Sequence, residues 1–169
     1  QPWIGGGEVM LFHIATAARE LGLPIVVVAP HHSDVAQRAQ HDGFALVEIH
    51  GEGTRGYLTG LRRWATQQRT GTLWCNGLRP AFATAGLPDR VVQLHRLPSR
   101  PQQLAAVAAA AGARVTLVPS EFMGDRFPRA QVLANWTSEL RFSPHQRLEG
   151  PLRVGFLGRL DPDKGWHVI

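Results

Sequence analysis

The chain has 169 residues, of which 44% are hydrophobic and 18% charged, and its net charge is +5. This length suits one domain, or one domain with part of another, and no apolar run is long enough to span a bilayer. Because Cys75 is the only cysteine, an intrachain disulfide and a cysteine-based zinc site are excluded, and a reducing, cytoplasmic location is expected.

The positive charge favours an anionic partner, and the distribution of the cations indicates which class of anionic partner fits best. The arginines are scattered along the chain, and no basic cluster is interleaved with aromatic residues. A nucleic-acid partner is therefore not expected. Nucleotide phosphates fit better, and an anionic lipid surface fits at most as a peripheral contact of the basic helix predicted over residues 56–69.

Three glycines precede the first predicted helix. Gly5, Gly6 and Gly7 lead into Glu8, after which apolar residues recur at helical spacing. Glycines before a helix N-terminus let backbone amides approach an anion, although a flexible turn uses the same residues. The predicted buried face of this helix consists of Met10, Ile14, Ala17, Ala18 and Leu21.

Six apolar segments alternate with helical patterns along the next part of the chain. The first is a continuous β-branched run, which is typical of a strand buried on both faces of a parallel sheet. Short loops join the segments, so we expect an α/β domain with a doubly wound, mostly parallel, Rossmann-like sheet. The predicted strands cover residues 23–30, 44–49, 72–76, 90–96, 113–119 and 131–136.

Histidines stand at the carboxyl ends of the first and fourth predicted strands. His31 and His32 come directly after the first, but no further metal ligand stands at a suitable spacing, so no metal site is predicted. His95 lies at the carboxyl end of the fourth strand, where ligands of doubly wound sheets gather. A histidine at that place can also be a purely structural cap of the strand.

The last stretch of the chain carries a turn with two cations. Residues 153–157 have the character of a parallel strand, and the turn Asp161–Asp163 separates them from a helix start predicted at Gly165. Arg159 and Lys164, the single lysine of the chain, flank this turn. A loop between a parallel strand and a helix N-terminus binds anions readily, so both cations can converge on one phosphate. An ordinary surface turn would carry the same charges.

This stretch resembles the signature of the retaining glycosyltransferases of family four, which have the two-lobed GT-B fold. The resemblance implies that Arg159 and Lys164 bind the diphosphate of a nucleotide-sugar donor and neutralise the leaving group. Catalysis would then depend mainly on electrostatic stabilisation of that leaving group. The matching residues are Gly158, Arg159, Leu160, Asp161, Pro162, Lys164 and Gly165.

The resemblance extends to the first part of the chain. Gly5, Gly6 and Glu8 match a Gly-Gly-x-Glu segment that faces the donor, so Gly6 and Gly7 would offer backbone amides to the diphosphate. His95 matches a histidine close to the transferred sugar and is the predicted catalytic residue. The implied reaction moves a sugar to an acceptor hydroxyl with retained configuration, and it requires neither a cofactor nor a metal ion.

The match also implies a domain organisation. Residues 1–136 would form the N-terminal lobe, residues 137–151 the linker, and residues 152–169 the start of the donor-binding lobe. The family's groups that bind the donor's ribose and sugar lie in the remainder of that second lobe. One copy of this chain is therefore expected to lack a complete donor site.

One strand of the family pattern is missing. In the family a central strand precedes the glycine segment, and residues 1–4 are too short to form it. We expect residues 153–157, an apolar strand without a sheet of its own, to fill the central slot, within the chain or by strand exchange in a homodimer. A strand upstream of Gln1 is the alternative.

Two other functions remain to be weighed against sugar transfer. The first is a non-catalytic lobe that associates with itself and has a structural or regulatory role. The second is a nucleotide-binding oxidoreductase, which is disfavoured because Gly5–Gly7 do not form a G-x-G-x-x-G fingerprint and no acidic residue ends the next predicted strand.

Overall fold

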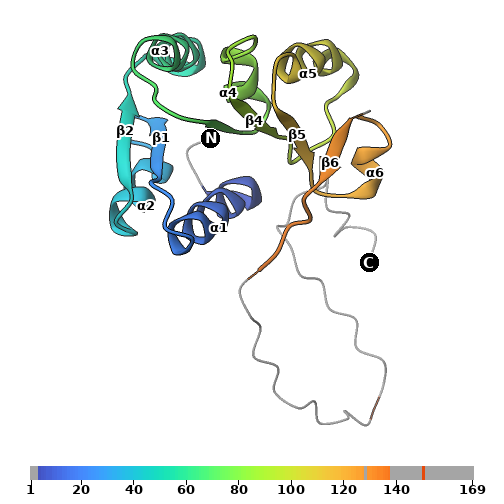
Figure 1. The fold of residues 1–169 in the computed structure, drawn as a ribbon, viewed down its shortest axis with the longest axis horizontal. Coiled ribbons are helices and arrows are strands. Elements are labelled where there is room, and N and C mark those ends of the chain that lie inside the picture. Colours follow the sequence, from blue (N-terminus) through green and yellow to red (C-terminus); the bar gives the residue numbers. More distant parts are fainter. Residues whose placement is uncertain (1–3, 128, 138–149, 151–169) are drawn as a thin grey trace. The chain divides into compact units, whose positions relative to one another are not determined.

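The structure, a computed structural model, describes residues 4–127, 129–137 and 150. Within this part of the chain, helices alternate with six parallel strands, as the sequence predicts (Figure 1). In chain order the elements are α1 (Gly6–Glu20), β1 (Val26–Pro30), α2 (Asp34–His41), β2 (Ala45–Ile49), α3 (Gly53–Gln67), β3 (Leu73–Asn76), α4 (Leu78–Ala83), β4 (Arg90–Gln93), the 3-10 turn η1 (Arg100–Gln102), α5 (Gln103–Ala110), β5 (Val115–Val118), α6 (Glu121–Gly124) and β6 (Ala130–Val132).

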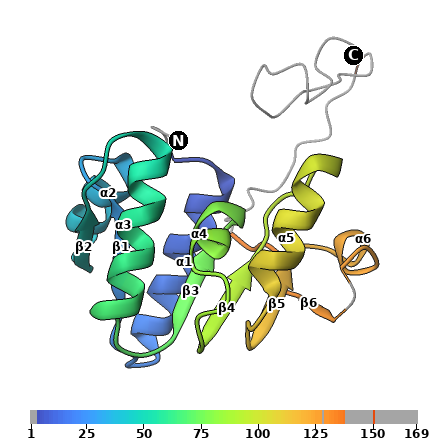
Figure 2. The same ribbon diagram turned by 90° about the horizontal axis from the view of Figure 1, so that it is seen from above.

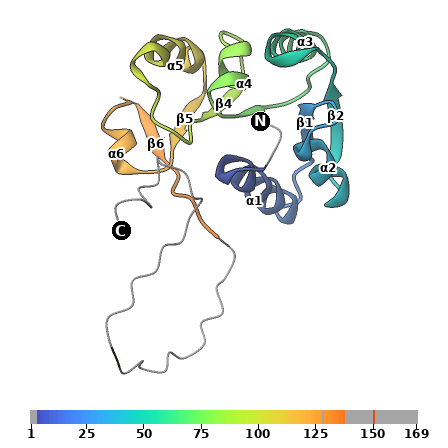
Figure 3. The same cartoon turned by 180° about the vertical axis from the view of Figure 1, so that it is seen from behind.

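Helices lie on both faces of the strands. Helices α3, α4 and α5 cover one face, and α1 and α2 lie on the other (Figures 1 and 3). One apolar cluster includes Cys75, Val92 and Ala109, and a second includes Phe12 and Phe44. This arrangement confirms the predicted α/β class with a Rossmann-like, doubly wound architecture.

The strands form two parallel sheets. Strands β1 and β2 pair from Val26 with Ala45 to Pro30 with Ile49, and the larger sheet has the order β3-β4-β5-β6. Figures 1 and 2 show β1, rather than β2, on the side of the larger sheet. Among the described residues no strand pairs with the other edge of β1 or of β3. The predicted central slot therefore falls between β1 and β3, whereas its predicted occupant, residues 153–157, lies outside the described residues.

The last strand is shorter than predicted. The sequence predicts a strand over residues 131–136, but β6 ends at Val132, and the Leu133 amide makes one more hydrogen bond to the Val118 carbonyl at 2.9 Å. The chain then leaves the sheet for α1, where the Trp136 carbonyl lies 3.2 Å from His13 Nδ1. This contact with the helix replaces further pairing with β5.

Residues Gln1–Ser138 form one compact unit. The predicted linker and the predicted start of a donor-binding lobe, residues 137–151 and 152–169, lie outside the described residues apart from Thr137 and Gly150. In the part of the chain that is described, no helix has the length and apolar character needed to cross a membrane.

Candidate functional site

The carboxyl ends of β3 and β4 lie against the start of α1. Asn76 is the last residue of β3, and His95 follows β4 by two residues. The Nε2 atom of His95 lies 2.6 Å from Asn76 Oδ1, and Asn76 Nδ2 donates to the Gly7 carbonyl at 3.0 Å. The structure thus brings together two predicted site residues, Gly7 and His95, through a third residue that the sequence analysis did not single out.

This hydrogen-bond chain fixes the tautomer of His95. A carbonyl oxygen only accepts, so the Gly7 carbonyl requires the amide nitrogen of Asn76 to face it. The Asn76 oxygen then faces the imidazole and accepts a hydrogen bond from Nε2–H. In the neutral ring the lone pair is consequently on Nδ1, which is buried and has no hydrogen-bond partner among the described residues. His95 therefore has an acceptor nitrogen without a partner in the described part of the chain, and a ligand reaches this atom when the groups that cover it move.

Burial lowers the pKa of His95 from its usual value of 6.5, and the charge of Glu8 opposes this shift. Desolvation disfavours the imidazolium form, so the neutral ring is the form present around neutral pH. A neutral imidazole with a free Nδ1 can accept a hydrogen bond from a hydroxyl group, such as those of a sugar.

The lowered pKa predicts acid sensitivity of the fold. Between the folded-state pKa and the unfolded value of 6.5, the unfolded chain binds more protons, so stability falls as the pH drops below about 6.5. His95→Gln removes this contribution. We expect the melting temperature of the wild type to fall more steeply than that of His95→Gln between about pH 7.5 and pH 5. His41→Gln is the matched control, and equal slopes for wild type and His95→Gln would contradict the prediction.

The N-terminus of α1, which packs against His95, carries free backbone amides. The first intrahelical bond runs from the Val9 amide to the Gly5 carbonyl at 3.0 Å, so the amides of Gly6, Gly7 and Glu8 have no acceptor within the helix. The Glu8 carboxylate accepts the Gly5 amide at 2.9 Å and closes the first turn. The exposed amide end of the helix favours an anion.

The two predicted diphosphate-binding glycines differ in what surrounds them. A Cβ on Gly7 would lie 3.0 Å from Cδ2 of His95, so the absence of a side chain allows the imidazole to pack against the helix. A Cβ on Gly6 would meet nothing within 4 Å, and Gly6 is exposed. Gly7 thus positions the histidine, and Gly6 leaves its amide accessible.

The two predicted cations, Arg159 and Lys164, lie outside the described residues. Their convergence with the amides of Gly6 and Gly7 on the donor diphosphate, beside a His95 that contacts the sugar, therefore stays a prediction.

A second polar cluster lies where β1 and β2 end. The Nδ1 atom of His31 lies 3.2 Å from Glu48 Oε2, and the His32 amide donates to Glu48 Oε1 at 3.1 Å. The His32 amide, followed by the His31 imidazole, lowers the pKa of Glu48 against the effect of burial. The ring centroid of His50 lies 3.9 Å from that of His31. Glu48 and His50, which the sequence spacing does not connect with His31, reach it through the pairing of the two strands.

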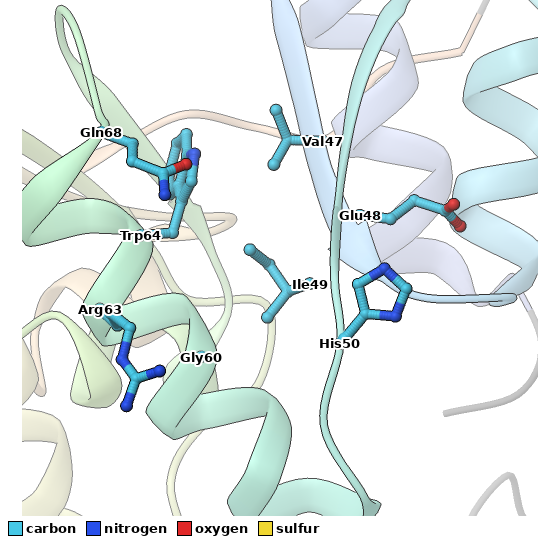
Figure 4. A pocket seen from close by; sticks show the side chains of 8 residues that line it. All are labelled: Val47, Glu48, Ile49, His50, Gly60, Arg63, Trp64 and Gln68. Carbon is cyan, nitrogen blue, oxygen red and sulfur yellow. The ribbon is translucent and has the colours of Figure 1, made fainter.

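A pocket of about 240 Å³ adjoins this cluster between β2 and α3. Figure 4 shows Glu48 and His50 on the β2 side and Arg63, Trp64 and Gln68 on the helix. The carboxylate of Glu48 points away from Trp64 and Gln68 in this view, so Glu48 serves the histidine cluster rather than the pocket (Figure 4).

Together these features define a Rossmann-like α/β protein with polar groups gathered at the carboxyl ends of its strands, where this class of fold binds ligands. Comparisons of the chain with models of known protein families, with curated proteins and with solved structures found no match.

Proposed function

We propose that this chain is a lobe of a glycosyltransferase that moves a sugar from a nucleotide-diphosphate sugar to an acceptor hydroxyl with retention of configuration. The observation that supports the proposal best is the contact chain from Gly7 through Asn76 to His95. It combines free helix amides, which suit a diphosphate, with a free imidazole acceptor, which suits a sugar hydroxyl. The resemblance of the Arg159 and Lys164 segment to family-four glycosyltransferases supports it independently.

In this proposal each group has a separate task. The amides of Gly6 and Gly7, with Arg159 and Lys164, hold the donor diphosphate and stabilise the charge that develops on it as the glycosidic bond breaks. His95 accepts a hydrogen bond from the sugar and orients it for transfer. Asn76 is a positioning residue, because it holds the imidazole in the tautomer that leaves Nδ1 free.

Isothermal titration calorimetry with UDP-, GDP- and ADP-glucose tests the proposal. We expect heat with at least one of the three, and binding that is weakened at least about tenfold in Lys164→Ala because a charge-assisted contact is lost. Arg114→Ala is the control for the loss of one positive charge, since that side chain is 69% exposed. Absence of heat with all three donors, or equal binding by Lys164→Ala, would contradict donor binding at this turn.

The open edges of β1 and β3 favour a second candidate, a lobe that associates with itself. Residues 153–157 of one copy would add a strand between β1 and β3 of another, giving a homodimer. Light scattering after size exclusion should then report a dimer, and Gly155→Pro should weaken it because proline cannot donate to a strand ladder. A monomer over the whole concentration range would rule this candidate out.

A further inference from the structure

We propose that His31, His32 and Glu48 bind one first-row divalent cation, for which Zn²⁺ is the best match. Each residue supplies one ligand atom, and these atoms lie within 4.8 Å of one another. Imidazole nitrogens with one carboxylate oxygen are a ligand set that Zn²⁺ prefers. Three protein ligands leave a fourth tetrahedral position for water or a bound group.

The separation of two of the ligand atoms fits a tetrahedral ion, and all three lie within 4.8 Å of one another. Ligand atoms about 2.0–2.1 Å from a tetrahedral Zn²⁺ are separated from one another by about 3.3 Å. His31 Nδ1 and Glu48 Oε2 already stand 3.2 Å apart. Nδ1 is buried, and its polar neighbour in the described residues is this carboxylate, so both atoms are placed to ligate one cation.

The backbone and the neighbouring rings hold the three ligands in place. His32 has φ 53°, a left-handed conformation that is uncommon for residues other than glycine, and it directs the His32 amide to Glu48 Oε1. That bond leaves the other carboxylate oxygen for a cation. The ring of His31 packs at a tilt against two others: its centroid lies 3.6 Å from that of His32, at 37°, and 3.9 Å from that of His50, at 40°. His50 is thus a positioning residue.

The cation would join two strands that have few other partners. His31 and His32 follow β1, and Glu48 belongs to β2, so the ion would cross-link both strands at their carboxyl ends. Among the described residues these strands form a sheet of only two members, and a two-stranded sheet is marginal unless other elements support it. A bound cation is therefore expected to stabilise the folded chain.

The test uses the full chain without a histidine tag, treated with chelator and then titrated with Zn²⁺ by calorimetry and with Co²⁺ by absorption spectroscopy. We expect one Zn²⁺ per chain, a tetrahedral Co²⁺ spectrum and a higher melting temperature with Zn²⁺. Glu48→Gln keeps the shape of the carboxylate. His32→Gly removes an imidazole at a position with positive φ, a conformation that glycine adopts readily. Each should bind Zn²⁺ at least about tenfold more weakly, since even loss of an outer partner of a ligand commonly has that effect.

His41→Ala is the matched control, because this histidine is 84% exposed and its ring pairs with the neighbouring Asp42. It should bind Zn²⁺ like the wild type. Circular dichroism checks that the variants fold. If Glu48→Gln does not fold, the Zn²⁺ affinity of His32→Gly alone tests the site. Substoichiometric binding by the wild type, or wild-type affinity in the folded variants, would overturn the site.

Discussion

Replacement of Arg90 by methionine is expected to lower the free energy of unfolding by about 2–5 kcal/mol, because buried carbonyls lose a donor. Arg90 is fully buried at the start of β4. Its guanidinium has no carboxylate partner in the described residues, and it donates instead to carbonyls around the ends of α4 and α5, where helix dipoles favour a cation. The acceptors are the carbonyls of Leu87 at 2.9 Å, Ala81 at 3.2 Å, Ala109 at 3.1 Å and Ala111 at 2.6 Å.

Methionine fills part of the volume but removes the donor of the buried Ala109 carbonyl and one of the two donors of the buried Ala81 carbonyl, which also accepts from Thr84 Oγ1 at 3.4 Å. A buried polar group left unpaired costs about 1–3 kcal/mol. Arg114→Met is the matched control. Arg114 pairs with Asp89 at 3.0 Å on the surface, where such a pair contributes about 0–1 kcal/mol. Urea unfolding of both variants measures the difference, and a loss below about 1 kcal/mol for Arg90→Met would contradict a stabilising role of this side chain.

The second large effect is expected at His95. In an enzyme that combines this lobe with a complete donor-binding lobe, His95→Ala should lower kcat/KM for sugar transfer by about 100-fold, because the variant loses the Nδ1 acceptor that orients the sugar. Calorimetry with UDP, GDP or ADP alone should change little, since the diphosphate contacts lie on other residues. Wild-type transfer rates in His95→Ala would contradict a role of His95 in the site.

The variant Asn76→Asp tests whether Asn76 sets the tautomer of His95 or only fills space beside it. The carboxylate still accepts from Nε2–H, but its charge raises the pKa of His95 and thereby favours a ring whose Nδ1 is a donor. The acid limb of the pH–rate profile should then move to higher pH, whereas a purely structural role of Asn76 would leave the profile in place.

The strands could be predicted from the sequence because buried parallel strands carry continuous apolar segments that short polar loops interrupt. The buried face of α1 could be predicted only in part, and Met10 is buried as predicted. The predicted face includes Leu21, which is 78% exposed, while Phe12 and Ala15, outside that face, are buried. The helix packs on the cluster with Phe44 and also contacts β3, so it lacks the single apolar stripe on which a periodicity argument depends.

The candidate site could be predicted only at residues whose position next to a strand or helix is visible in the local sequence. His95 at a strand end and the glycines before a helix are visible in the sequence. Asn76 was missed, although a polar residue between an apolar strand and Gly77 was a usable sign. Glu48 reads as one alternating position of a strand, and only the register of β2 against β1 brings it to His31. The pairing of two strands that are distant in the sequence leaves no pattern in the residues of either strand.

The most direct test of donor binding is a map of where a nucleotide sugar contacts the chain. In ¹⁵N-labelled protein titrated with UDP-, GDP- and ADP-glucose, we predict that one donor shifts the amide resonances of Gly6 and Gly7 and the ring resonances of His95, together with those of Arg159 and Lys164. The helix α5 serves as the internal reference. Shifts that avoid the start of α1 and His95, or no shifts with any of the three donors, would contradict the proposed sugar-transfer site.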